Sequence, residues 1–343
     1  MMEIFALDVG SGTQDVLVID DKLKDFKAKV VMPAPTRLFA SGIRKAGKDI
    51  FCDGYTMGGG AISMALVNHA KKFRVVMTED AARTVRDDLE QVKERGIEIG
   101  AEADMREDYS KFTLRDVDMD SFRSSFKAMN YELPGPRDLV VAVAVQDHGS
   151  APKGMSDREF RFEQIAGIIK KGATFRDFII TRETPVFTRA SAVIRSLHDQ
   201  GYHNVLVMDT KIAGIFGGMY GAKLPAIVMD VGNGHTTAAS ITEDGSIVGI
   251  FEHHTFSLTP NKMKDYIERL ANATLTNEEI FNDGGHGAYV REPISPESII
   301  VTGPRRMQAE ETGLNIRYAT PLEDVYMVGP VGMVRAYQDM KGI

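Results

Sequence analysis

The chain has 343 residues, of which 43% are hydrophobic and 26% charged, and its formal net charge is −7. This length allows two domains with separate cores, and the composition is ordinary for a folded, soluble protein. The acidic balance argues against a dedicated nucleic-acid surface, and no apolar run in the sequence is long enough to cross a membrane. The first ten residues lack a basic region and include Glu3 and Asp8, so we expect no signal peptide and a cytoplasmic protein.

Cys52 is the only cysteine in the sequence. A single thiol excludes an internal disulfide and a zinc site built from cysteines. It also excludes an iron–sulfur cluster held by one chain, because several cysteine thiolates hold such a cluster.

Short apolar runs and glycine-rich turns alternate at the start of the chain. Residues 3–9 and 15–20 are β-rich and are separated by Gly-Ser-Gly-Thr, which predicts two strands joined by a hairpin-like turn. Residues 138–149 form a nearly continuous run of valine and alanine, typical of a strand buried on both faces of a parallel sheet. Residues 101–130 are polar and charged, and we expect an insertion at the edge of the domain there.

Other elements of the first half follow from periodicity and from their start and stop residues. We expect helices that begin after glycines or end at one, such as the helix that ends at Gly96. The expected strands are 73–78 and 204–209, and the expected helices are 58–72, 79–96, 157–171 and 185–200.

The pattern of the first turn recurs in the second half of the chain. A small-residue helix at 210–222 precedes an expected strand at 225–232, which ends in Asp-Val-Gly-x-Gly like the first strand. The segments ALDVGSGTQDVLVID and VMDVGNGHTTAASIT therefore indicate duplication at the scale of a domain. We expect one domain at 1–222, with the C-terminal helix 326–343 packed back on it, and a second domain at 223–325.

Two glycine-rich turns, each following a strand that ends in aspartate, form a candidate phosphate site. Glycine lets the backbone of a turn approach an anion closely, and the exposed N–H groups can bind phosphate oxygens. An aspartate would repel phosphate directly but can hold a hydrated Mg²⁺ ion. One such turn alone would more simply be an ordinary hairpin, whereas two facing turns could hold a triphosphate from both sides.

Five segments in this order resemble the motifs of the superfamily of actin, the seventy-kilodalton heat-shock chaperones and the sugar kinases. They resemble, in turn, the first phosphate motif, the first connecting helix, the second phosphate motif, the adenosine motif and the second connecting helix, at residues 6–20, 208–221, 226–240, 298–310 and 323–337. The resemblance implies an α/β fold of two ribonuclease-H-like domains that flank a nucleotide cleft. It also implies ATP and Mg²⁺ as cofactors and phosphoryl transfer to a small metabolite, as in a kinase, or to water, as in a hydrolase.

The resemblance assigns roles to individual residues. Asp8 and Asp230 would hold Mg²⁺ through water, and Asp209 would orient a water molecule or act as a base. The nucleotide would contact both phosphate turns and a reduced adenosine turn, formed by Gly10, Ser11, Gly12, Thr13, Gln14, Gly232, Asn233, Gly234, His235, Thr236, Gly303 and Pro304. The first turn departs from many sugar kinases, because Gln14 and Asp15 stand where those enzymes have a basic residue.

A pocket for the phosphoryl acceptor is expected in the first domain. Asp147 and His148 end the valine-rich strand, where open α/β sheets tend to bind ligands. Asp53 and the glycine turn with Gly58 and Gly59 are the other expected lining residues, and we expect His148 and Asp53 to face the cleft. The simpler interpretations are a capped strand-to-loop turn for the first pair and a closely packed helix start for the glycines.

Two histidine-containing segments receive no functional role from the sequence. Residues 252–254, Glu-His-His, are expected to be a strand end at the surface. Residues 283–288, Asp-Gly-Gly-His-Gly-Ala, are expected to be a loop.

A nucleotide-dependent switch or scaffold, with slow hydrolysis and a protein partner, is the alternative to a kinase or ATPase. Fast turnover stimulated by a metabolite favours the kinase, and slow turnover stimulated by a protein favours the switch. Within the superfamily, the chain resembles a small, mostly archaeal family whose turns read Gly-x-Gly-Thr-Gln-Asp and Gly-Asn-Gly-His-Thr. Some members carry the label of a pyruvate formate-lyase activating enzyme, which we reject here because that radical chemistry needs three cysteines on one cluster.

Overall fold

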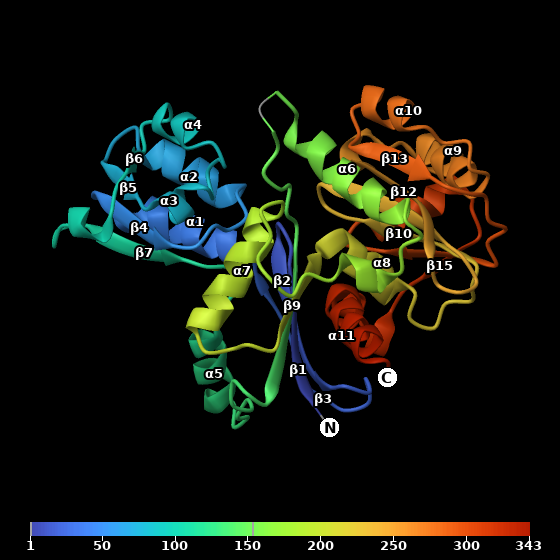
Figure 1. Cartoon of the computed structure of the whole chain (residues 1–343), viewed down its shortest axis with the longest axis horizontal. Helices are drawn as coiled ribbons and strands as arrows, with labels where there is room; N and C mark the ends of the chain where they lie inside the picture. Colours follow the sequence, from blue (N-terminus) through green and yellow to red (C-terminus); the bar gives the residue numbers. More distant parts are fainter. Residues whose placement is uncertain (1, 153) are drawn as a thin grey trace.

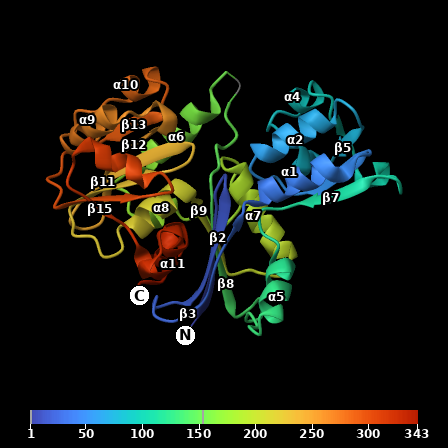
Figure 2. The same ribbon diagram turned by 180° about the vertical axis from the view of Figure 1, so that it is seen from behind.

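The protein is a mixed α/β molecule whose strands form three separate sheets. The computed structural model describes residues 2–152 and 154–343. Helices α8 (Thr210–Gly218) and α11 (Val328–Lys341) lie between the five-stranded and the six-stranded sheet (Figure 1). The four-stranded sheet lies beyond the opposite side of the five-stranded sheet, as the reverse view also shows (Figure 2). No helix within the described residues has the length and apolar character needed to cross a membrane.

The five-stranded sheet begins with the predicted hairpin. Its order is β3-β2-β1-β8-β9, in which β2 is antiparallel to β1 and β3, whereas β8 and β9 run parallel to β1. Both faces of this sheet are covered, because α8 and α11 pack on one and α5 and α7 on the other. All seven residues of β8 are buried, as its valine-rich sequence predicts. The bounds are β1 Glu3–Val9, β2 Thr13–Asp20, β3 Phe26–Pro33, β8 Leu139–Val145, β9 Val205–Asp209, α5 Met119–Ala128 and α7 Thr188–Asp199.

The six-stranded sheet repeats the topology of the first. Its order is β13-β12-β11-β10-β14-β15, and without β13 the order and strand directions are those of the five-stranded sheet. The two equivalent sheets confirm the predicted α/β fold of two ribonuclease-H-like units. The bounds are β10 Ala226–Val231, β11 His235–Ile241, β12 Ile247–His254, β13 Gly287–Val290, β14 Ser298–Thr302, β15 Ile316–Tyr318, α6 Asp157–Ile169, α9 Pro260–Ala271 and α10 Asn277–Asn282.

The four-stranded sheet has a core of its own and is larger than the predicted insertion. Its strands are parallel in the order β6-β5-β4-β7. The segment 101–130 is not one insertion, because its first part supplies β7 and its second part supplies α5 on the five-stranded sheet. The expected helix 79–96 is also divided, into α3 and α4. The bounds are β4 Ile50–Gly54, β5 Val75–Met77, β6 Glu98–Ile99, β7 Ser110–Leu114, α1 Pro35–Ala46, α2 Ala61–His69, α3 Glu79–Ala82 and α4 Leu89–Lys93.

Helices α8 and α11 cross with their backbones in contact. A Cβ atom added at Gly217 would lie 1.8 Å from the carbonyl oxygen of Val328. One added at Gly332 would lie 1.9 Å from the carbonyl oxygen of Ala213. The small residues of both helices therefore permit the close crossing that the resemblance implies. Helix α11 also packs on β1 and β8, while the division of the chain into domains at residue 222 stays a prediction.

We expect Gly332→Ala to lower the free energy of unfolding by about 1–3 kcal/mol or more, because the added methyl group can fit only if the two helices separate. Gly167 in α6 is the matched control, since a Cβ atom there would have no neighbour within 4 Å. Gly167→Ala should be neutral or stabilising by up to about 1 kcal/mol, from helix propensity alone. Urea denaturation compares the two variants, and equal stability would contradict the close crossing.

Candidate functional site

The two glycine turns have the same backbone geometry. The Gly10 N–H donates to the Thr13 carbonyl oxygen at 2.9 Å, and the Gly232 N–H donates to the His235 carbonyl oxygen at 3.0 Å. Each turn joins the first two strands of its sheet, β1 to β2 and β10 to β11. The N–H groups of Gly12 and Gly234, at the tips, donate to no acceptor within the described part of the chain. Both turns therefore present free backbone donors.

The two turns also lie close together in space. A Cβ atom added at Gly12 would lie 3.6 Å from Nδ2 of Asn233. Ser11 and Asn233 are exposed, so the tips are open to solvent. The structure therefore brings together two segments more than 200 positions apart in sequence, as the repeated motif predicts.

Carboxylates lie beneath the first turn. Asp8, the last residue but one of β1, lies next to Asp15 of β2, which is its partner in the strand register. Oδ1 of Asp8 accepts a hydrogen bond from Oγ1 of Thr210 at 2.6 Å. Burial, with a further contribution from Asp15, raises the pKa of Asp8 to about 7. Burial likewise raises the pKa of Asp15 to about 6.

Asp15 received no role from the sequence, yet one of its carboxylate oxygens is free to bind a cation. Its Oδ1 atom is buried and has no hydrogen-bond partner among the described residues. Two adjacent carboxyl groups with raised pKa values are a place where a bound cation would relieve unfavourable burial and repulsion. The residues beneath the first turn therefore fit Mg²⁺, whose preferred ligands are oxygen atoms.

A lysine occupies the equivalent place beneath the second turn. Nζ of Lys211 lies 2.7 Å from Oδ2 of Asp230 and donates to the His235 carbonyl oxygen at 3.2 Å. Gly303 packs against the same carboxylate: its φ is +94°, and an added Cβ atom would lie 2.4 Å from Oδ1 of Asp230. The predicted metal ligand Asp230 is thus already paired with a cation. Lys211 supplies the positive charge that the first turn lacks, and the sequence signal for it is its place at the start of a connecting helix.

Asp209 is not free to act as a base, and we withdraw that role. It caps α8 by accepting from the Lys211 N–H at 2.9 Å. It also accepts from Nε and Nη2 of Arg161, at 3.1 and 2.9 Å. Arg161 is fully buried and pairs with Glu252 of β12 as well. The Asp209 carboxylate is therefore part of a buried ion-pair network that joins the two sheets.

Two predicted phosphate contacts instead stabilise the turns from behind. Gln14 is buried, and its Nε2 donates to the Pro33 carbonyl oxygen at 3.1 Å. Thr236 is fully buried, with its hydroxyl 3.0 Å from Oγ1 of Thr255, which in turn donates to the Gly232 carbonyl oxygen. Neither side chain is available to a ligand. We therefore remove both from the set of phosphate contacts.

The predicted acceptor pocket is not formed by its two carboxylates. Asp147 is buried and accepts from the Gly149 and Ala190 N–H groups, so it caps α7. Asp53 is buried in β4 and pairs with Lys111 of β7 at 2.6 Å. These bonds satisfy Asp147 and tie Asp53 to the four-stranded sheet, so both predictions of a pocket role fail.

The glycine turn at 58–60 is explained by packing. A Cβ atom at Gly58 would lie 2.7 Å from Cζ of Arg189, and one at Gly59 would lie 2.9 Å from Oγ of Ser63. The simpler interpretation, a closely packed helix start, is the one the contacts support. Of the predicted pocket residues, His148 alone lies beside the second unit, with its ring centroid 6.4 Å from that of His286.

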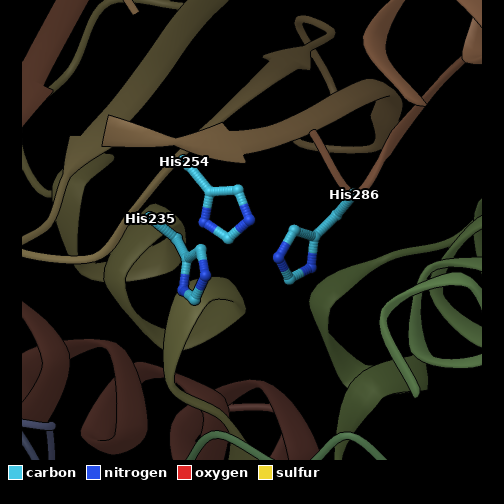
Figure 3. A group of neighbouring side chains, drawn as sticks. All are labelled: His235, His254 and His286. Atoms are coloured by element: carbon cyan, nitrogen blue, oxygen red, sulfur yellow. The ribbon is translucent and has the colours of Figure 1, made fainter. Parts of the chain in front are cut away.

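His235 faces other histidines. Its ring centroid lies 4.8 Å from that of His254 and 4.6 Å from that of His286 (Figure 3). Burial lowers the pKa of His235 to about 4, so its ring is neutral at pH 7. A neutral ring supplies no positive charge to a phosphate, which weakens its predicted role in the second turn.

These features define a protein of two ribonuclease-H-like units whose equivalent glycine turns meet. The model of a family described as "Putative pyruvate format-lyase activating enzyme (DUF1786)" matches residues 57–308, and the chain belongs to this family. The description's activity does not suit this chain, because Cys52 is its single cysteine and a radical-forming cluster needs three. Comparison with curated proteins gave no match.

Several solved structures are similar over nearly the whole chain. The polyphosphate/ATP-glucomannokinase of Arthrobacter sp. strain KM has 13% identity and a TM-score of 0.39, covering 99% of this chain and 100% of its own. The ethanolamine utilization protein EutJ of Carboxydothermus hydrogenoformans has 13% identity and a TM-score of 0.36, covering 97% and 88%. The activator of the 2-hydroxyisocaproyl-CoA dehydratase of Clostridium difficile has 10% identity and a TM-score of 0.34, covering 100% and 98%.

Proposed function

We propose that the protein binds Mg-ATP between its two glycine turns and promotes transfer of the γ-phosphoryl group to a small metabolite or to water. The observation that carries this proposal is the meeting of two equivalent turns, with Asn233 of one against Gly12 of the other. Free backbone N–H groups on both turns suit an extended polyphosphate, which needs donors along its length.

The residues around the turns would have separate roles in binding the phosphates and the metal ion. The N–H groups of Gly12 and Gly234 would bind phosphate oxygens, and Lys211 would place a positive charge beside them. Asp8 and Asp15 would hold Mg²⁺, directly or through water. Mg²⁺, when bound, neutralises charge on the phosphates during transfer. Asp230 would fix the position of Lys211 through their ion pair, rather than contribute to the metal site.

The contacts of the predicted pocket residues favour water as the phosphoryl acceptor, or a role that involves a protein partner, over a metabolite bound in the pocket predicted from sequence. Asp53, Asp147 and Asp209, the carboxylates expected near the acceptor, all have other partners. A nucleotide-dependent switch acting on a protein partner is therefore the second candidate. Turnover distinguishes the two: stimulation by a metabolite supports the kinase, and slow hydrolysis stimulated by a protein supports the switch.

Mg-ATP is expected to stabilise the fold. Ligand at 100 times its dissociation constant adds about 2.7 kcal/mol to the free energy of unfolding by linkage. Thermal unfolding with Mg-ATP, with ATP plus EDTA and with Mg²⁺ alone separates the contributions of nucleotide and metal. The Mg-ATP sample should unfold at the highest temperature. The absence of any shift at millimolar Mg-ATP, together with no heat in calorimetric titration, would refute the proposal.

A further inference from the structure

Three histidines from separate segments converge at one edge of the six-stranded sheet. His235 begins β11 and His254 ends β12, and the two are direct partners in the strand register. His286 lies immediately before β13. One ring nitrogen from each residue lies within 4.8 Å of one nitrogen of each of the others. Figure 3 shows the three rings turned toward a common space.

The environment of His286 resembles the surroundings of a metal ligand. Its Nδ1 atom lies 3.4 Å from Oε1 of Glu252, and both atoms are buried without a hydrogen-bond partner among the described residues. The ring is only 3% exposed. Metal-binding histidines commonly present their second ring nitrogen to a carboxylate, which fixes the ring and its tautomer. In Figure 3 the other ring nitrogen of His286 points toward His235 and His254.

Glu252 is itself held firmly in this role. Its other oxygen, Oε2, pairs with the fully buried Arg161. Oε1 therefore remains for His286. An unpartnered, buried carboxylate oxygen and an unpartnered ring nitrogen next to each other form a hydrogen bond as soon as a small ring movement brings them together.

We propose that His235, His254 and His286 bind one divalent transition-metal ion of the class that prefers imidazole, with Zn²⁺ as the reference ion. Tetrahedral zinc with nitrogen ligands at about 2.0–2.1 Å requires ligand nitrogens about 3.3 Å apart. The three histidines now hold one nitrogen each within 4.8 Å of the others, so zinc binding requires the rings to move closer together. Three protein ligands leave one position open for water or another ligand, as in catalytic zinc sites. The ligand set also differs from that proposed for Mg²⁺, because imidazole suits transition metals and carboxylates suit Mg²⁺.

The exposure of the histidines also agrees with a metal site. His235 and His254 are only half-buried, which leaves a path for an ion from solvent. His148 is a fourth histidine beside this cluster, with its ring centroid 6.4 Å from that of His286.

Zinc binding can be measured without nucleotide, so the result is independent of the proposed ATP site. Calorimetric titration of ZnCl₂ into the untagged, metal-stripped full chain should give one ion per chain. His254→Gln and His286→Asn should each weaken binding by more than the roughly 10–100-fold that loss of an outer-sphere partner costs. The control is the double variant His198→Gln/His203→Gln, which removes an exposed histidine pair with ring centroids 5.1 Å apart and should bind zinc like the wild type.

Co²⁺ provides a second readout, which reports the coordination of the bound ion directly. The wild-type chain with Co²⁺ should show the strong visible absorption of a four-coordinate ion, and His254→Gln, with its half-buried side chain, should lose it. Unchanged zinc affinity and cobalt spectrum in His254→Gln would overturn the proposal. So would loss of zinc binding in the surface double variant alone, or a wild-type chain that takes up no zinc.

Discussion

Arg161→Met is expected to lower the free energy of unfolding by about 3–5 kcal/mol, the usual result when one partner of a buried ion pair is removed. Arg161 is fully buried and reaches from α6 to carboxylates of both sheets, Asp209 at the end of β9 and Glu252 in β12. Methionine fills similar space but leaves two carboxylates without a cation. The loss should therefore exceed that of any exposed ion pair in the molecule.

A neutralised network is the matched control for Arg161→Met. Replacing a whole buried ion network by neutral groups often costs little, because no uncompensated charge remains. The triple variant Arg161→Met/Asp209→Asn/Glu252→Gln should therefore recover much of the stability that the single variant loses. Chemical denaturation measures both. A single variant that loses less than about 1 kcal/mol would show that Arg161 does not hold the two sheets together.

Asp8→Asn is expected to reduce phosphoryl transfer by about 100-fold or more, because it removes a carboxylate proposed to hold Mg²⁺. The same change should not destabilise the fold. Asparagine keeps the size of the side chain and can still accept from Thr210. Asp25→Asn, on the exposed β2–β3 connection, is the control and should keep wild-type turnover.

The difference in stability between Asp8→Asn and the wild type should also depend on pH in a defined direction. The folded-state pKa of Asp8 is raised to about 7 from an ordinary value of 3.8, so the folded protein binds the proton more tightly than the unfolded chain. The wild type therefore loses stability as pH rises from about 4 to about 7, with a slope of at most about 1.4 kcal/mol per pH unit from one group. Asp8→Asn lacks this loss and should gain on the wild type over that range, without Mg²⁺. Normal turnover, or an unchanged pH profile of stability, would show that Asp8 is not in the site we propose.

The fold was predictable because its signals are local and repeated. Asp-Val-Gly-x-Gly ends a strand in both halves of the chain, and each copy carries its own hairpin. The valine-rich run predicts β8, a strand buried along its whole length, from composition alone. Of the four-stranded sheet, only β5 was predicted, within the expected strand 73–78. The other strands were missed because they are short, two to five residues, and leave little periodicity to detect.

The chemistry of the site was predictable only in part. The turns themselves follow from glycine spacing, but which side chains face a ligand depends on tertiary partners. The sequence predicts a free acid at the end of a strand for Asp209. In the structure Asp209 is paired with Arg161, which is 48 positions away in the chain. The sequence predicts a strand end at 252–254 and a loop at 283–288. The pairing of β11, β12 and β13, which places His254 and His286 beside His235, is not visible in the sequence.

The most direct test of the central claim is a crystal structure of the protein with Mg²⁺ and a non-hydrolysable ATP analogue. The proposal predicts density for the triphosphate between the Gly10–Thr13 turn and the Gly232–His235 turn. It also predicts the metal ion beside Asp8 and Asp15, with Lys211 next to a phosphate oxygen. A nucleotide bound by neither turn or by one turn alone, or no nucleotide density at millimolar concentration, would contradict it.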